Sequence, residues 1–236
     1  MRKVLGYLKR AQNQFQMIRE GDVIAVGLSG GKDSMTLLYA LHLFQRFCPV
    51  SYTLKAVTLD LGFPGFDFRL ISQYCDSLGV ELFLEHTAIG PVVFDQRREK
   101  SPCSLCARMR RGRLHRLCDE KGITKLALGH HGDDLTESFL MSMLYEGRLS
   151  SFLPVTHYER ARVVMIRPLI CAPEEEIRLA ALSHHIPVVK NPCPAEGQTK
   201  RETVKNWLAA LEASQPGAKA HMREALLKSL SREVII

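Results

Sequence analysis

Residues 23–34 read VIAVGLSGGKDS, and this stretch decides the fold. Val23–Leu28 is a short apolar run with β-branched residues, which predicts a buried strand. A glycine-rich turn follows, and Asp33–Arg46 then has apolar residues at helical spacing. Two adjacent glycines let a backbone approach an anion closely, and the free N–H groups at a helix start point toward it. The stretch therefore predicts an anion site between a strand and a helix.

The spacing of this loop excludes two common nucleotide motifs. A Walker A loop needs one more residue between its glycines and Ser or Thr where Asp33 stands, and G-x-G-x-x-G does not match either. The loop resembles the PP-loop, S-G-G-x-D-S, of the ATP-pyrophosphatase superfamily. That resemblance implies that the loop holds the pyrophosphate of ATP, which is cleaved between the α- and β-phosphates. A plain helix N-cap is the alternative. The residues expected at the nucleotide are Ser29, Gly30, Gly31, Lys32, Asp33 and Ser34, with Lys32 and Asp33 also expected in catalysis.

Strands alternate with helices outward from this loop. We predict further strands at 52–59, 80–86, 125–128 and 163–166, and helices at 4–19, 67–79, 104–121, 133–146, from 173 onward, at 199–213 and at 218–231. This order predicts an α/β fold, a parallel sheet with helices on both faces, with ligands at the carboxyl ends of the strands. We expect an N-terminal helix (1–20), a PP-loop, adenine nucleotide α-hydrolase-like domain (21–190) and a C-terminal helical extension (191–236).

The composition is that of a cytoplasmic protein with no membrane segment. No apolar run approaches the ~20 residues that cross a bilayer, and the basic N-terminus lacks the apolar region of a signal peptide. Seven cysteines, an odd number, argue against a disulfide framework. The stretch from Arg97 to Lys125 holds ten Lys or Arg against three Asp or Glu, an excess that equals the net charge of +7. The concentrated charge indicates a polyanionic partner.

A second motif, LGHHGDDLTES at residues 128–138, also follows a predicted strand and begins a helix. Asp133, Asp134 and Glu137 fall within one turn, and their oxygens could hold Mg²⁺ on the ATP phosphates. Alternatively, the acidic residues only complement the helix dipole. The motif is similar to the superfamily's G-H-x-x-D-D sequence. We expect Asp134 in catalysis, Asp133 and Asp134 at Mg²⁺, and these further residues at the nucleotide: Asp60, Gly129 and His130.

Cys103 and Cys106 form a C-x-x-C pair immediately before a predicted helix. Such a pair can bind zinc, hold part of an iron–sulfur cluster or exchange disulfides. The residue types and their spacing leave these three options open. Arg108 and Arg111, on the helix after the pair, are candidates for RNA phosphate contacts together with Arg97 and Arg98. A solvated basic face is the alternative for these arginines.

The ordered set of motifs resembles the tRNA 2-thiocytidine synthetase family of the TtcA type. The set consists of the phosphate loop, CSLCARMRRG at 103–112, LGHHGDD at 128–134, IRPL at 166–169 and Pro192-Cys193. The resemblance implies a [4Fe–4S] cluster on Cys103, Cys106 and Cys193. It also implies that ATP adenylates the C2 oxygen of a tRNA cytidine, and that sulfur then replaces that oxygen. A cysteine desulfurase or another sulfide donor is the implied partner.

Other readings of the motif set stay open. Cys193-Pro194-Ala195-Glu196 replaces the pattern of a second nearby cysteine that the family predicts. The alternatives are a paralogous PP-loop thiolase acting on another tRNA base or a small molecule, and a non-catalytic iron–sulfur redox or nucleic-acid-binding protein. The oligomeric state is open, with a homodimer as one option.

Overall fold

A computed structural model describes residues 1–97, 102–158, 162–190, 192–195 and 200–233 of the chain. Its strands are β1 (Asp22–Leu28), β2 (Tyr52–Asp60), β3 (Glu81–His86), β4 (Lys125–Ala127), β5 (Val155–Thr156) and β6 (Val164–Ile166). Its α-helices are α1 (Arg2–Phe15), α2 (Lys32–Phe44), α3 (Phe68–Ser77), α4 (Ile89–Pro91), α5 (Pro102–Glu120), α6 (Gly132–Glu146), α7 (Glu174–Ser183), α8 (Lys200–Ser214) and α9 (Ala218–Glu233), and a π-helical segment, η1 (Val92–Arg97), follows α4.

The six strands form one sheet in the order β3-β2-β1-β4-β6-β5. All neighbouring strands are parallel except β5, which pairs antiparallel with β6. The chain leaves β1 toward β2 and β3, and later returns to the other side of β1 with β4. The strand order therefore reverses between β1 and β4, and such a point is where open α/β sheets bind ligands.

Helices cover both faces of the sheet because β1 alternates its side chains between two apolar cores. Ile24 and Val26 belong to the core that also holds buried residues of α1, α2, α3 and α7. Ala25 belongs to the core that contains Leu117 and Cys118 of α5. Successive side chains of a strand point to opposite faces, so a run without polar residues is buried on both sides. The predicted α/β fold with helices on both faces is confirmed.

Helix α1 and strand β5 differ from the sequence-based expectation, and α4 and η1 lie in a stretch that was expected to be irregular. Helix α1 ends at Phe15 and not at residue 19, because Gln16 adopts a left-handed conformation with φ of 47°. The Gln12 side chain then bonds both backbone groups of Ile18, at 2.8 Å each, and holds the turn. Strand β5 was not predicted, since two residues are too short to produce a periodic pattern.

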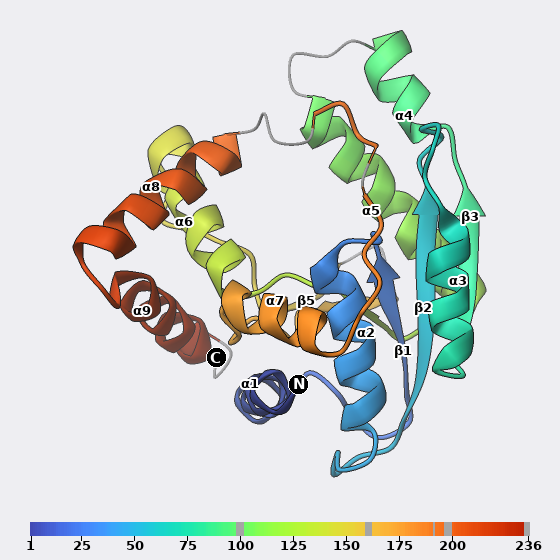
Figure 1. Ribbon diagram of the computed structural model, residues 1–236, viewed down its shortest axis with the longest axis horizontal. Helices are drawn as coiled ribbons and strands as arrows, with labels where there is room; N and C mark the ends of the chain where they lie inside the picture. The colour runs from blue at the N-terminus through green and yellow to red at the C-terminus, as the bar shows by residue number, and fades with distance from the viewer. Residues whose placement is uncertain (98–101, 159–161, 191, 196–199, 234–236) are drawn as a thin grey trace.

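The C-terminal helices α8 and α9 lie against α6, and α1 lies beside α9 (Figure 1). Arg10 of α1 forms a salt bridge with Glu224 of α9 at 2.6 Å. The segment after α7 passes α2 and reaches the start of α5 before the chain continues to α8 (Figure 1). Within the described ranges, every helix is too short or too polar to cross a lipid bilayer.

Candidate active site

The phosphate loop leaves β1 at Leu28 and enters α2 with Gly31 as the N-cap residue. Gly30 has φ of +79°, a conformation that glycine adopts without strain. The Ser29 and Ser34 hydroxyls lie 3.2 Å apart, and the Ser34 hydroxyl also donates to the Gly31 carbonyl at 3.1 Å. The loop therefore holds its shape through its own serines and leaves the first N–H groups of α2 available to an anion.

Three other segments, around Phe66, Gly129 and Val189, pack closely against this loop and leave no room for a side chain at Gly30. A Cβ atom on Gly30 would lie 3.0 Å from both Phe66 and Val189. A Cβ atom on Gly129, in the loop after β4, would lie 2.8 Å from the backbone nitrogen of Ser34. The Val189 N–H donates to the Gly30 carbonyl at 2.9 Å. The loop is thus packed between the motif after β4 and the segment that leads to Cys193.

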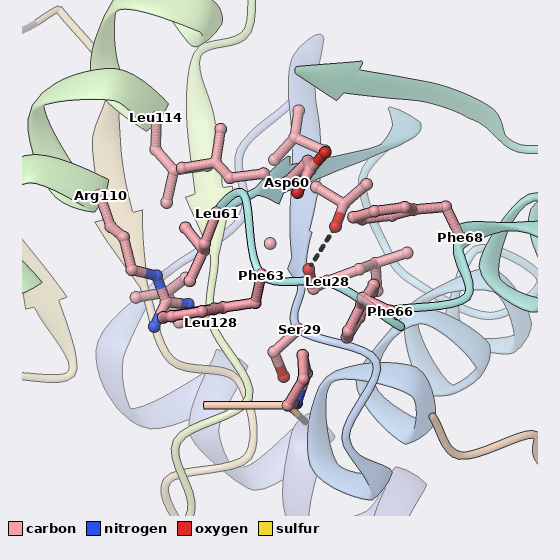
Figure 2. Close-up of a pocket in the computed structure, with 15 residues that line it drawn as sticks. Leu28, Ser29, Asp60, Leu61, Phe63, Phe66, Phe68, Arg110, Leu114 and Leu128 are labelled. Carbon is pink, nitrogen blue, oxygen red and sulfur yellow. Dashed lines mark hydrogen bonds between the residues drawn. The ribbon is translucent and has the colours of Figure 1, made fainter. Parts of the chain in front are cut away.

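A first cavity, which we call the aromatic compartment, opens beside the loop. It has an open volume of about 680 Å³ and lies beyond the carboxyl ends of β1 and β2. Figure 2 shows Phe66 and Phe68 on one side, Arg110 and Leu114 of α5 on the other, and Ser29 below. Asp60 lies at the top of this cavity, where β2 ends (Figure 2). Such a cavity can bind a ring system, because its apolar walls pack against the ring faces and the Asp60 carboxylate can accept hydrogen bonds from polar edges.

A second cavity, which we call the arginine compartment, adjoins the first and is larger, with an open volume of about 1150 Å³. The two cavities share wall residues, namely Gly27, Ser29, Arg110, Leu114 and Leu128. The other charged and polar residues of its wall are Asp33, Ser34, Arg111, His130, Asp134, Tyr158, Arg167 and Arg201. The phosphate loop therefore contributes residues to both compartments.

Lys32 lies at the loop in a network of salt bridges. Its ammonium group is 2.7 Å from Asp33 and 2.9 Å from Glu174, the first residue of α7, and Glu174 also pairs with Lys205 of α8 at 2.9 Å. Burial lowers the pKa of Lys32, but the two carboxylates outweigh it and the pKa is raised. Burial alone would raise the pKa of Glu174, and hydrogen bonds from Lys32 and Lys205 hold it at about 2. Lys32 is therefore a permanently charged group next to the anion site.

The two adjacent aspartates of the second motif point in different directions. Asp134 lines the arginine compartment and caps α6 together with His131, whose backbone N–H it accepts at 3.0 Å. Asp133 is 4% exposed, accepts the Glu174 N–H at 2.7 Å and pairs with Lys219 of α9. The structure does not bring Asp133 to either compartment. Asp33 and Asp134 are the carboxylates of the arginine compartment that could hold a metal ion with the nucleotide.

Glu137 is buried beneath Asp134 and carries a perturbed pKa. Its side chain is 5% exposed, with Arg201 at 3.7 Å. Burial and the neighbouring Asp134 raise its pKa from 4.5 to about 7, although Arg201 and Lys205 act in the opposite direction, and Glu174 adds to the rise. Between these two pKa values the folded protein binds more protons than the unfolded chain. The free energy of unfolding therefore falls as the pH rises from 4.5 to 7.

Replacing Glu137 by glutamine removes the loss of stability that accompanies ionisation of the buried Glu137 carboxyl group. We expect the free energy of unfolding of Glu137→Gln to exceed that of the wild type by roughly 2 to 4 kcal/mol at pH 8, from about 1.4 kcal/mol per pKa unit. At pH 5 the two proteins should be nearly equal. Urea unfolding at both pH values measures the difference, with Glu202→Gln on the exposed face of α8 as the control. A gain that is the same at both pH values would contradict the assignment.

His130 lines the arginine compartment as a neutral group. Burial, with Arg167, Arg201 and His131, lowers its pKa to about 4 against the opposing effect of Asp134. Its ring packs on Phe152 at 5.2 Å. Its Nδ1 atom is buried and has no hydrogen-bond partner among the described residues. The imidazole is therefore neutral and does not supply charge to the compartment near neutral pH.

The three predicted cluster cysteines interact at the start of α5. Cys103 is exposed and Cys106 is half-buried on the same helix, while Cys193 is half-buried in the segment after α7. Burial raises the pKa of the Cys106 thiol, Arg110 lowers it, and the thiols of Cys193 and Cys103 raise it further. These mutual effects require the sulfurs to lie near one another. Among the described residues, no three His, Cys, Asp or Glu side chains are arranged to hold a single metal ion.

The predicted RNA-binding arginines occupy different places. Arg111 lines the arginine compartment, with its guanidinium 5.7 Å from the centre of the Tyr158 ring, and Arg108 is exposed on the same helix. Arg97 is exposed at the end of η1. Arg98 lies outside the described residues. The structure places Arg108 and Arg111 on the same helix as Cys103 and Cys106.

Several site residues were missed by sequence reasoning. Arg201 and Glu174 come from segments without a recognised motif, and Tyr158 lies in a stretch without periodicity. Arg167 belongs to the quoted IRPL motif but received no role. Its guanidinium donates to the Leu153 carbonyl at 2.5 Å and to Thr156 at 2.9 Å, and packs over the Phe152 ring at 4.9 Å. Arg167 therefore supports the wall of the compartment.

Comparisons with known proteins agree with this geometry. Residues 6–211 match the family of PP-loop domains. The chain is 42% identical to a tRNA-cytidine(32) 2-sulfurtransferase of Pelobacter propionicus over 94% of its own length and 82% of that protein. It is 40% identical to the protein of the same name from Geobacter sulfurreducens, over 95% and 89% of the two chains. The U34-tRNA thiolase NcsA from Methanococcus maripaludis, solved with its [4Fe–4S] cluster, superposes with a TM-score of 0.79 at 25% identity, over 98% of this chain and 78% of that one.

Proposed function

The chain belongs to the PP-loop family of tRNA-cytidine(32) 2-sulfurtransferases, and we infer that it is an enzyme that uses ATP to replace the C2 oxygen of a tRNA cytidine with sulfur. One observation carries this inference. The arginine compartment is lined by Ser29 and Ser34 of the phosphate loop and also by Ala107 of α5, which follows Cys106 in the chain. A base in this compartment would lie near both the ATP phosphates and the start of α5 that carries the cysteine pair.

The aromatic compartment is the place for the adenosine part of ATP. Phe63, Phe66 and Phe68 offer apolar surface to the adenine ring, and Asp60 can accept hydrogen bonds from ribose or base. Because Ser29 lines both compartments, the α-phosphate of a nucleotide bound here would lie at their junction. The β- and γ-phosphates would then extend over the N-terminus of α2 toward Lys32.

The residues of the site serve the first chemical step directly. The C2 oxygen of the cytidine attacks the α-phosphorus, the bond to the bridging oxygen breaks, and pyrophosphate leaves with the added negative charge. The N–H groups of the loop and the Lys32 ammonium stabilise that charge. The adenylated oxygen is then a good leaving group, and a sulfide that adds at C2 expels AMP. Asp33 and Asp134 are the residues that would hold Mg²⁺ on the phosphates.

Cys103, Cys106 and Cys193 are the residues that would hold a [4Fe–4S] cluster. Three thiolates leave one iron of such a cluster without a protein ligand, and the bound group would supply sulfur at that position. The raised pKa of Cys106 means that its proton must leave when it binds iron, and Arg110 favours the thiolate that results. We propose a cysteine desulfurase or another sulfide donor as the source of sulfur and a cytoplasmic location, and a homodimer is one option for the assembly.

Nucleoside mass spectrometry of tRNA tests the function. Cells that lack the protein should lose 2-thiocytidine at position 32 of their tRNAs and keep their other thiolated nucleosides. The gene supplied on a plasmid should restore it. A loss of 2-thiouridine with unchanged 2-thiocytidine would place the protein with uridine thiolases, and an unchanged nucleoside profile would overturn the proposed substrate.

A further inference from the structure

Helix α8 brings Arg201 to the phosphate end of the arginine compartment. The Nη1 atom of Arg201 lies 2.9 Å from Asp134 and 3.7 Å from Glu137, and Nη2 donates to the Ser138 hydroxyl at 3.2 Å. Arg201 lines the same cavity as Asp33 and Ser34 of the phosphate loop. A cation from the C-terminal helices is therefore present at the site where the nucleotide phosphates are expected.

Three lysines of α8 and α9 are held by groups outside the cavity. Lys205 is bound to Glu174, Lys219 is bound to the buried Asp133, and Lys200 lies 4.5 Å over the Tyr145 ring on α6. None of these three lines either compartment. The side chain of Arg201 is 41% exposed even though it is held by Asp134, which is itself 19% exposed. Arg201 thus combines a fixed position with access to a ligand.

Arg110, Arg111, Arg167 and Arg201 all line the cavity, and Arg201 is the arginine that lies against Asp134 of the second motif. Lys32 is balanced by Asp33 and Glu174, which both lie within 3 Å of its ammonium group. Arg167, another arginine of the cavity wall, is bound to its own supporting loop. Pyrophosphate carries several negative charges when it leaves, and a planar guanidinium can bind two of its oxygens at once.

We propose that Arg201 is a further catalytic residue, which binds the β- and γ-phosphates of ATP and stabilises the departing pyrophosphate, with Asp134 as its positioning residue. This inference rests on the proposed function. This role also involves the C-terminal extension in the reaction. The extension carries Cys193, and its helix α8 carries Arg201. The competing explanation is that Arg201 only attaches α8 to α6.

The test compares Arg201→Ala with Lys200→Ala. Both substitutions remove a contact between α8 and α6, but only the first removes a group from the cavity. With cluster-loaded protein, ATP and tRNA, we expect the kcat for pyrophosphate release to fall about 100-fold or more in Arg201→Ala, the magnitude typical of losing one donor to a transition-state anion. The KM for ATP should change much less. Lys200→Ala should stay within about threefold of the wild type, and iron content should be unchanged in both.

Chemical rescue separates the catalytic role from a structural one. Guanidinium ion at millimolar concentration should raise the rate of Arg201→Ala about tenfold, because it supplies the missing group to the cavity. The same addition should not raise the rate of an unrelated slow variant. Retention of kcat in Arg201→Ala, or a loss of activity that accompanies loss of iron and is not rescued, would overturn the proposal. Absence of tRNA-dependent pyrophosphate release in the wild-type protein would overturn the proposed function itself, and this inference with it.

Discussion

Lys32→Ala is expected to lower tRNA-dependent pyrophosphate release by a factor of about 10² to 10³, because the variant loses the fixed positive charge next to the leaving group. Lys32 is the loop's own cation, and its pKa is raised by Asp33 and Glu174, so it is charged throughout the physiological range. A steady-state assay of released pyrophosphate, with AMP counted in parallel, measures the effect. A binding-only role would instead raise the KM for ATP and leave kcat unchanged.

The loss should not come from unfolding. Glu174 keeps Lys205 as a partner when Lys32 is removed, and Asp33 is 31% exposed, so neither carboxylate becomes a buried unpaired charge. Lys55→Ala is the matched control, because Lys55 of β2 is also partly buried in a salt bridge, to Glu81 at 3.0 Å, and lies outside the phosphate loop. We expect Lys55→Ala to keep the wild-type rate within about twofold. Equal losses in the two variants would mean that Lys32 acts through stability.

The part of the site that could be predicted is the part that is local in sequence. Residues 23–34 contain the strand, the loop and the helix start, so the neighbours that define the anion site are contiguous. The same holds for Asp134, which caps its own helix. The choice between Asp133 and Asp134 could not be made, because adjacent residues of a helix point about 100° apart and the sequence does not show which direction faces the cavity.

The part that could not be predicted depends on long-range packing. Arg201 meets Asp134 across 67 residues, and Glu174 reaches Lys32 only because α7 packs beside α2. Both are ordinary charged residues of amphipathic helices, and such residues usually face solvent. Cys193 could be assigned only through the family resemblance, since a cysteine between two prolines has no periodicity that would direct it to α5. The motifs thus identified the phosphate loop and the cysteines, while Arg201 and Glu174 are brought to the site by tertiary packing.

Cys193→Ala should abolish tRNA thiolation, with at least a 100-fold loss of 2-thiocytidine formed, and should remove most of the iron and sulfide from anaerobically prepared protein. Cys103 and Cys106 lie one turn apart on α5 and provide two ligands from one side, so the third must come from another segment. Its absence leaves two thiols, one of which, Cys106, has a raised pKa and favours its protonated form. Iron analysis, visible absorbance and nucleoside mass spectrometry measure the outcome.

The informative feature of this variant is the split between the two chemical stages. The phosphate loop, Lys32 and Arg201 are untouched, so the first turnover of tRNA-dependent pyrophosphate release, one pyrophosphate per adenylated tRNA, should slow by less than about tenfold while thiolation is lost. Cys48→Ala is the control, because Cys48 is also half-buried but follows α2, at the opposite end of the strands from the site. It should keep both iron and thiolation. Full iron content in Cys193→Ala would separate Cys193 from the cluster, and the adenylation site would then need a different source of sulfur.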